Sequence, residues 1–171
     1  MTTKRVSFIL AAAFLLAASL LTAHPHFRKT VDASTRDMEV KVQYTTYPYN
    51  EAHLDSVEDG FIFNCGNATL SIAKGNLTAG GQALAAGNYL LRARAKNTDD
   101  WTLLLVPEAQ AGDPRNPDLS NAIELQTVTL TGQPTTHHLS LDLHGGHGPT
   151  DGKLVLSLLF GPRTLETGFE L

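Results

Sequence analysis

Apolar and polar residues alternate along much of this chain, and this alternation restricts its fold more than any other feature. Polar residues separate four apolar ones between positions 38 and 44: Met38, Val40, Val42 and Tyr44. A period of two places successive side chains on opposite faces of a strand, so the segment is expected to be a half-buried β-strand. The pattern recurs at 69–74 and 89–95, and the short apolar run 101–106 predicts a strand covered on both faces.

The second half of the chain predicts more strands after a polar loop at 107–118. They are expected at 123–130, 137–144, 153–160 and 164–171. Within 123–130 the apolar positions change from odd to even numbers, which indicates a bulge or bend near Thr127. Strands at such short spacing predict an all-β fold, an antiparallel β-sandwich of about eight or nine strands.

One short helix is expected at 50–58, where Asn50 is suited to be the N-cap and Glu51 lies in the first turn. The sequence shows no internal repeat, and its 171 residues suit a single folded domain after a leader segment. We expect a signal peptide at 1–23, an N-terminal extension at 24–36 and the β-sandwich domain at 37–171.

The leader is predicted from its charge pattern. Lys4 and Arg5 precede an apolar run at 6–21 that is shorter than the ~20 residues of a membrane-spanning helix. A signal peptide is therefore favoured over a membrane anchor, with cleavage after Ala23. The mature protein is expected to be exported, periplasmic or secreted, with no membrane insertion after cleavage.

Composition and motifs exclude several classes of function. The net charge of −4 provides no basic stripe for a phosphate backbone, so nucleic acid is not an expected partner. Cys65 is the single cysteine, so no disulfide forms within the chain, and a buried thiol is favoured over a nucleophile. None of the common hydrolase, metalloprotease or nucleotide-binding motifs is present, so we expect a non-enzymatic protein with no cofactor.

Histidines are the residues best suited to chemistry. Cleavage after Ala23 would make His24 the mature N-terminus, where its α-amine and ring nitrogen could chelate copper(II). His26 and one of His138, His144 or His147 would supply the remaining nitrogen. The alternative is a frayed, solvated terminus that binds nothing.

The strand at 137–144 limits this metal site. Asp142 and His144 share its polar face at ~6.6 Å, whereas His138 is ~13 Å from Asp142, so three ligands from this strand cannot converge. The glycines after His144 could fold back to add His147. An ordinary solvent-facing sheet is the alternative.

The main functional hypothesis is a module that binds a ligand or a protein at the loops of one end of the sandwich. The candidate residues are Tyr47, Tyr49, Asn50 and Trp101. Packing in the core or at a sheet edge is the alternative for the three aromatic residues.

Three segments, at 66–69, 84–91 and 101–105, contain an Asn-Ala-Thr run, a Leu-Ala-Ala-Gly-Asn-Tyr turn and strand, and a Trp-Thr strand. In these the chain resembles the bacterial exported family called domain of unknown function 2911, as a divergent member, over about 40–106. It departs from that family at Asn64-Cys65, where the family usually has Trp-Arg. The resemblance implies a β-rich exported domain and transfers no catalytic residue.

Overall fold

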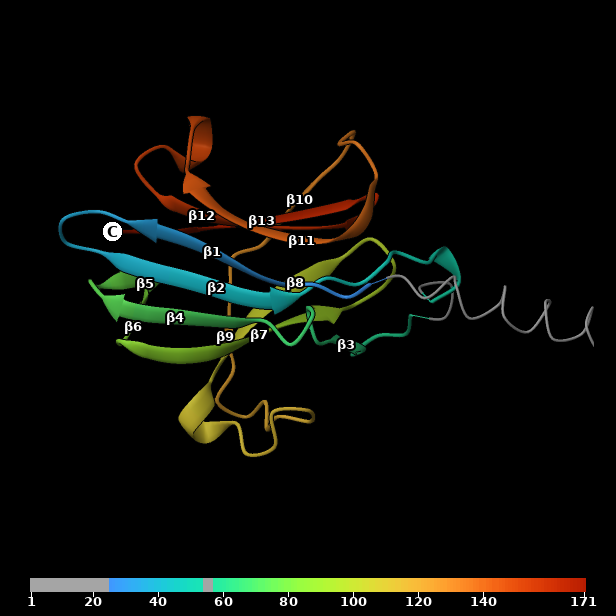
Figure 1. Cartoon of the computed structure of the whole chain (residues 1–171), viewed down its shortest axis with the longest axis horizontal. Coiled ribbons are helices and arrows are strands. Elements are labelled where there is room, and N and C mark those ends of the chain that lie inside the picture. The colour runs from blue at the N-terminus through green and yellow to red at the C-terminus, as the bar shows by residue number, and fades with distance from the viewer. Residues whose placement is uncertain (1–24, 54–56) are drawn as a thin grey trace, which may run out of the picture.

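The computed structural model describes residues 25–53 and 57–171 and is all-β (Figure 1). The predicted signal peptide, its cleavage site and His24 lie outside the described residues. Within them, no helix is long and apolar enough to cross a membrane. The described residues form thirteen strands: β1 (Arg28–Ser34), β2 (Glu39–Thr45), β3 (Ile62–Phe63), β4 (Thr69–Lys74), β5 (Leu77–Ala79), β6 (Gln82–Leu84), β7 (Gly87–Ala95), β8 (Trp101–Pro107), β9 (Ile123–Glu124), β10 (Val128–Leu130), β11 (Thr136–Gly145), β12 (Leu154–Gly161) and β13 (Arg163–Phe169).

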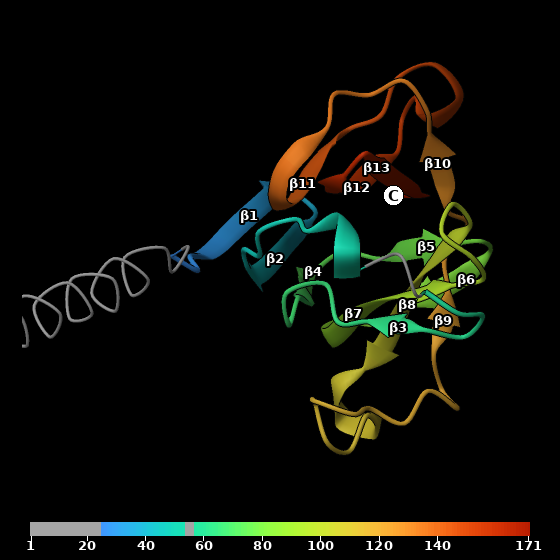
Figure 2. The same cartoon turned by 90° about the vertical axis from the view of Figure 1, so that its right-hand side faces the viewer.

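Two antiparallel sheets form the sandwich. The larger has the order β1-β2-β4-β7-β8-β9, with β3 also paired to β7, and the smaller has the order β10-β13-β12-β11. The hairpin β5-β6 is a separate two-stranded sheet. Figures 1 and 2 both show the orange and red strands of the smaller sheet stacked over the larger one.

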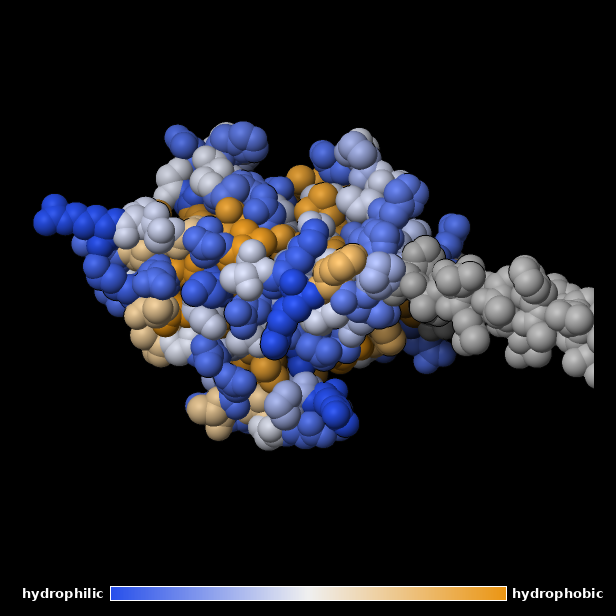
Figure 3. All heavy atoms as spheres, viewed as in Figure 1, coloured by the Kyte–Doolittle hydropathy of each residue, from blue (hydrophilic) through white to orange (hydrophobic). Residues whose placement is uncertain are grey.

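The core lies between the sheets and confirms the predicted alternation. Val40, Val42 and Tyr44 of β2 face Leu139, Leu141 and Leu143 of β11 across one hydrophobic cluster. On the face seen in Figure 3, hydrophilic residues cover most of the surface, and hydrophobic atoms are visible mainly where β1 approaches β11. Since apolar burial stabilises by roughly 25 cal/mol per Å², this interior is the main source of stability.

The change of apolar positions near Thr127 marks the point where the chain crosses between the sheets. β9 pairs with β8 in the larger sheet, whereas β10 pairs with β13 in the smaller one. The Thr127 hydroxyl accepts a hydrogen bond from Leu103 N at 2.8 Å and donates one to Leu125 O at 3.1 Å. The predicted bend is therefore confirmed, and its side chain ties the crossing to β8.

Three details differ from the sequence predictions. The strands outnumber the expected eight or nine because several have only two or three residues. At 50–58 the described part holds only the 3₁₀ turn η2 (Glu51–His53), where Asn50 Oδ1 accepts from Ala52 N at 3.1 Å. Residues 28–34, assigned to the N-terminal extension, form edge strand β1, so the sandwich begins at Arg28. β1 buries only one face in part, at Val31 and Ala33, which explains its weak pattern.

The polar loop after β8 covers the outer face of the larger sheet. It contains the 3₁₀ turn η3 (Glu108–Gln110), and Ala111 packs against Leu90 and Val106. Arg92 beneath it is 1% exposed, and its guanidinium donates to Pro114 O at 2.6 Å and to Leu91 O at 2.7 Å. Burial lowers the pKa of Arg92. β8 is therefore covered on both faces, as predicted.

Candidate functional site

Trp101, one of the predicted binding residues, is part of the core. Its side chain is 5% exposed, and its indole Nε1 donates to Thr98 O at 2.9 Å. The rings of Phe61 and Phe63 meet it edge-on, with centroids at 6.1 and 6.3 Å. This arrangement agrees with the packing alternative for Trp101.

The other three residues of that group also have structural contacts. Tyr49 meets the Phe160 ring edge-on at 5.4 Å, and Tyr47 meets the His26 ring at 5.6 Å. Both tyrosines are partly buried against the core, while Asn50 caps the turn at Ala52. Tyr47 and Tyr49 therefore combine core packing with partial exposure, and Asn50 is exposed.

The structure separates the candidate histidines into two groups. His26 Nδ1 donates to Thr46 O at 2.8 Å, and His138 forms a bridge with nearby Pro48, so both lie at the end where β1 begins. His144 and His147 lie at the other end of β11. At ~3.3 Å per residue along β11, His138 lies ~20 Å from His144. The histidines at the two ends of β11 therefore cannot bind the same ion.

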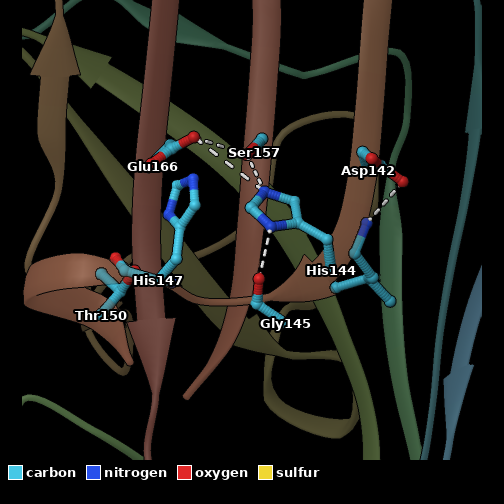
Figure 4. Close-up of polar contacts among 8 residues, drawn as sticks. Asp142, His144, Gly145, His147, Thr150, Ser157 and Glu166 are labelled. Atoms are coloured by element: carbon cyan, nitrogen blue, oxygen red, sulfur yellow. Dashed lines mark hydrogen bonds and ion pairs between the residues drawn. The ribbon is translucent and has the colours of Figure 1, made fainter. Parts of the chain in front are cut away.

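Within the described residues, no group of three or more His, Cys, Asp and Glu side chains is placed to hold a metal ion. Asp142, expected to meet His144 on an ion, accepts a hydrogen bond from Leu143 N at 2.9 Å through Oδ1. Its carboxylate is turned toward its own backbone (Figure 4).

Cys65 is fully buried. Burial raises the pKa of its thiol, and the nearby Arg92 guanidinium lowers it by less. The predicted burial of the thiol is therefore confirmed, and this burial disfavours the thiolate that a nucleophile requires.

A polar network crosses the outer face of the smaller sheet, with one residue from each of three adjacent strands. His144 Nε2 of β11 lies 2.9 Å from Ser157 Oγ of β12, and Ser157 donates to Glu166 Oε1 of β13 at 3.1 Å (Figure 4). His144 Nδ1 lies 3.1 Å from Gly145 O. The register makes Ser157 and Glu166 direct cross-strand partners, so the sheet itself sets this geometry.

The network is a support for Glu166 and not a catalytic triad. In a triad the carboxylate holds the histidine, which in turn contacts the serine hydroxyl. Here the carboxylate contacts Ser157, and the second histidine nitrogen faces a backbone carbonyl. Ser157 is only 4% exposed, so its hydroxyl is poorly placed to attack a substrate. Among the described residues, hydrogen bonds fix one Glu166 oxygen and leave the other available.

Glu166 lines a groove of about 680 Å³ beside the edge of β13. The groove lies between β10 and the 3₁₀ turn η4 (Gly148–Thr150), which belongs to the connection from β11 to β12. Its apolar lining includes Val128, Leu130 and Pro149, and Val128 is 58% exposed. Polar residues complete the lining: Gln126, His147, Thr150, Lys153, Glu166 and Thr167.

Gly168 forms part of the groove lining without a side chain. A Cβ built there would lie 2.9 Å from Lys153 Cδ and 3.7 Å from Thr150 Cγ2, so these two side chains lie over it. Lys153 is held at this rim by an ion pair with Glu170, with Nζ and Oε1 3.6 Å apart. Any larger residue at 168 would reduce the space.

The backbone of Gly168 also faces the groove. In the β12-β13 hairpin, Phe160 and Arg163 are cross-strand partners on either side of a two-residue turn. From Arg163 onward, the backbone N–H and C=O groups of β13 therefore point alternately toward β12 and away from it. Glu170 N–H and C=O point away from β12, since they pair with Thr78, so Gly168 has the same orientation. The pair of β10 and β13 nearest to Gly168 is Val128 with Glu166, so β10 does not extend beside Gly168. The amide and carbonyl of Gly168 therefore lie at an open stretch of the edge of β13.

A second groove, of about 580 Å³, lies near β6, β7 and η3. Its lining includes four alanines and one glycine, and Glu108 is the one charged side chain among the described residues that line it. It offers fewer polar groups for recognition than the groove at Glu166.

The residues predicted from the sequence near this site are His144 and His147, whereas Glu166, Ser157, Gly168 and Val128 were not predicted. Glu166 and Ser157 are polar residues in otherwise apolar strands, which is the signal that could have found them. Their adjacency depends on the pairing of β12 with β13, which the sequence does not specify.

No family model matches this chain, and neither a curated protein nor a solved structure matches it. The resemblance to domain of unknown function 2911 therefore stays a prediction. The segments that carry it, at 66–69, 84–91 and 101–105, lead into or form β4, β7 and β8, which are consecutive strands of the larger sheet.

Proposed function

We propose that this protein is an exported, non-enzymatic β-sandwich module that binds a small organic ligand in the groove between β10 and η4. The observation that carries the proposal is the meeting of an apolar wall and a fixed carboxylate in one groove. Ligand sites are commonly concave, of about 300–1,000 Å³, and mostly apolar with a few placed polar groups. Val128 and Leu130 supply the apolar wall, and Glu166 supplies the polar group.

Export is supported by the charge and length of the segment at 1–23. A role in binding instead of catalysis is supported by the network, because Ser157 is buried and donates its hydroxyl hydrogen to the Glu166 carboxylate, which lies 4.0 Å from His144 Nε2. The resemblance to an exported family at 40–106 is consistent with both.

The test is a fragment screen by two-dimensional NMR on the purified protein and on Gly168→Val. The valine side chain would project among Lys153 and Thr150 and fill the groove, so fragments that shift Val128 and Leu130 signals should lose binding. Gly145→Val is the matched control, because a Cβ there has nothing within 4 Å and Gly145 is outside the groove lining. Fragments that bind Gly168→Val as well as the unchanged protein would contradict the proposal.

Copper binding at His24 with His26 and His138 is the second candidate. It is favoured by one observation, that His26 and His138 lie at the same end of the sandwich. Mass spectrometry of the secreted protein tests it first, since any N-terminal residue other than His24 removes the amine ligand. Copper titration follows: His24→Ala and His138→Ala should weaken binding, and His147→Ala should not. Equal affinity in all forms would exclude this site.

A further inference from the structure

The groove presents three hydrogen-bond acceptors, two from β13 and one from the segment that precedes β10. The free oxygen of Glu166 belongs to β13, the amide oxygen of Gln126 comes from the crossing before β10, and the carbonyl of Gly168 lies at the open strand edge. Ser157 keeps the carboxylate in place, and Gln126 Cγ would contact a Cβ at Gly80 at 3.5 Å, which places that side chain against the β5-β6 turn. The acceptors are therefore supported from outside the groove.

The charge of the groove favours a cation. With histidine counted as neutral, Glu166 and Glu170 provide two carboxylates at or beside the groove, against the single ammonium of Lys153. Glu170 already pairs with Lys153, whereas Glu166 Oε1 lies 4.0 Å from His144 Nε2, which carries a charge only when the ring is protonated. Glu166 is therefore the carboxylate left for a ligand. The Glu166 side chain is 24% exposed, so its charge is less screened than that of a fully solvated carboxylate.

We propose that the ligand of this groove is a primary amine with an apolar body, whose protonated ammonium group binds Glu166 and whose hydrocarbon part lies along Val128, Leu130 and Pro149. This inference rests on the proposed binding function and specifies its ligand class. A primary ammonium has three donors and no acceptor, which matches the acceptors from Glu166, Gln126 and Gly168. Its bond to a carboxylate is charge-assisted and strong.

Two related ligand classes fit less well. A carboxylic acid of the same length would bring its negative charge to Glu166. A quaternary ammonium has no N–H to donate and is usually held by aromatic rings, and no aromatic ring other than the His147 imidazole is among the described residues that line the groove.

The experiment compares n-hexylamine, hexan-1-ol, hexanoate and hexyltrimethylammonium by NMR titration of the purified protein. For a fragment of this size we expect a Kd for n-hexylamine on the order of 1 mM. The other three probes should bind at least about tenfold more weakly, because they lose the charge-assisted hydrogen bonds.

Two variants separate a specific contact from general charge attraction. Glu166→Gln keeps an oxygen to accept from Ser157 and removes the charge, so it should weaken n-hexylamine binding about tenfold or more. Asp151→Asn makes the same change of charge at an exposed residue directly after η4, outside the groove lining, and should alter binding by less than about twofold.

The outcomes are distinguishable. Binding of n-hexylamine that is selective and sensitive to Glu166→Gln supports the inference. Binding of hexan-1-ol or hexanoate that equals that of the amine and is lost in Gly168→Val would overturn the amine and leave the groove as a ligand site. Absence of any probe from the groove, together with a fragment screen that finds no binding there, would overturn both proposals.

Discussion

Replacement of Gly66 by alanine should destabilise the fold strongly, because this glycine sits in a tight turn against β2. Its φ is +72°, in the left-handed region, and a Cβ would lie 2.2 Å from Thr45 O and 2.8 Å from Leu139 Cδ2. The Thr45 oxygen belongs to the backbone and cannot rotate away. If the turn at residue 66 moved away from Thr45 to relieve this contact, the hydrogen bond from Thr45 N to Gly66 O, which is 2.8 Å long, would be stretched.

The cost can be estimated from three contributions. A left-handed conformation costs alanine about 1 kcal/mol, loss of the hydrogen bond about 1 kcal/mol, and displacement of Leu139 in a packed core about 1–3 kcal/mol. The sum is about 3–5 kcal/mol in the free energy of unfolding. In a protein of this size each kcal/mol lowers Tm by about 2–4 °C, so Tm should fall by roughly 10 °C.

Urea unfolding followed by circular dichroism measures this change, with Gly132→Ala as the control. Gly132 has a nearly identical φ of +74°, and a Cβ there has nothing within 4 Å, so the control retains only the backbone cost of about 1 kcal/mol. Equal destabilisation by the two substitutions would refute the reasoning from close contacts.

Three further predictions concern other parts of the fold. Burial raises the pKa of the Cys65 thiol in the folded state above its unfolded value of about 8.5. The stability that the buried, protonated thiol contributes is therefore fully present below about pH 8.5 and is lost as the pH rises above it. Between about pH 8 and 10, the free energy of unfolding should therefore decrease less in Cys65→Ala than in the unchanged protein. Alkylation of the thiol in the folded, unchanged protein should be slow. Arg92→Met removes the bonds to Leu91 O and Pro114 O and should cost about 2–4 kcal/mol, with faster proteolysis in the loop after β8. Thr127→Val should cost about 1–2 kcal/mol by urea unfolding, because Leu103 N loses its acceptor, whereas Thr129→Val at an exposed position should cost less than about 0.5 kcal/mol.

The strands could be predicted from the sequence where one face is buried. The alternation in β2 and β11, the bend at Thr127 and the coverage of β8 all follow from apolar positions. β1 could not be recognised, because an edge strand over the rim of the sandwich needs few apolar residues. Local pattern therefore indicates strands only where they contribute to the core.

The candidate site was largely beyond prediction, because it depends on contacts between strands. Glu166 gains its position from Ser157 and His144 on two neighbouring strands. The groove exists because β10 begins only at Val128, beside Glu166, and leaves the edge at Gly168 open. Both facts come from strand register and strand length, which a single sequence does not determine.

Intermolecular NOEs between n-hexylamine and the methyl groups of the protein test the central claim most directly. We predict NOEs from the hexyl protons to Val128 and Leu130, which line the groove. Large apolar residues are also exposed elsewhere, at Phe27, Phe61 and Leu171. NOEs to these residues, with none to Val128 or Leu130, would contradict the assignment of the groove as the ligand site.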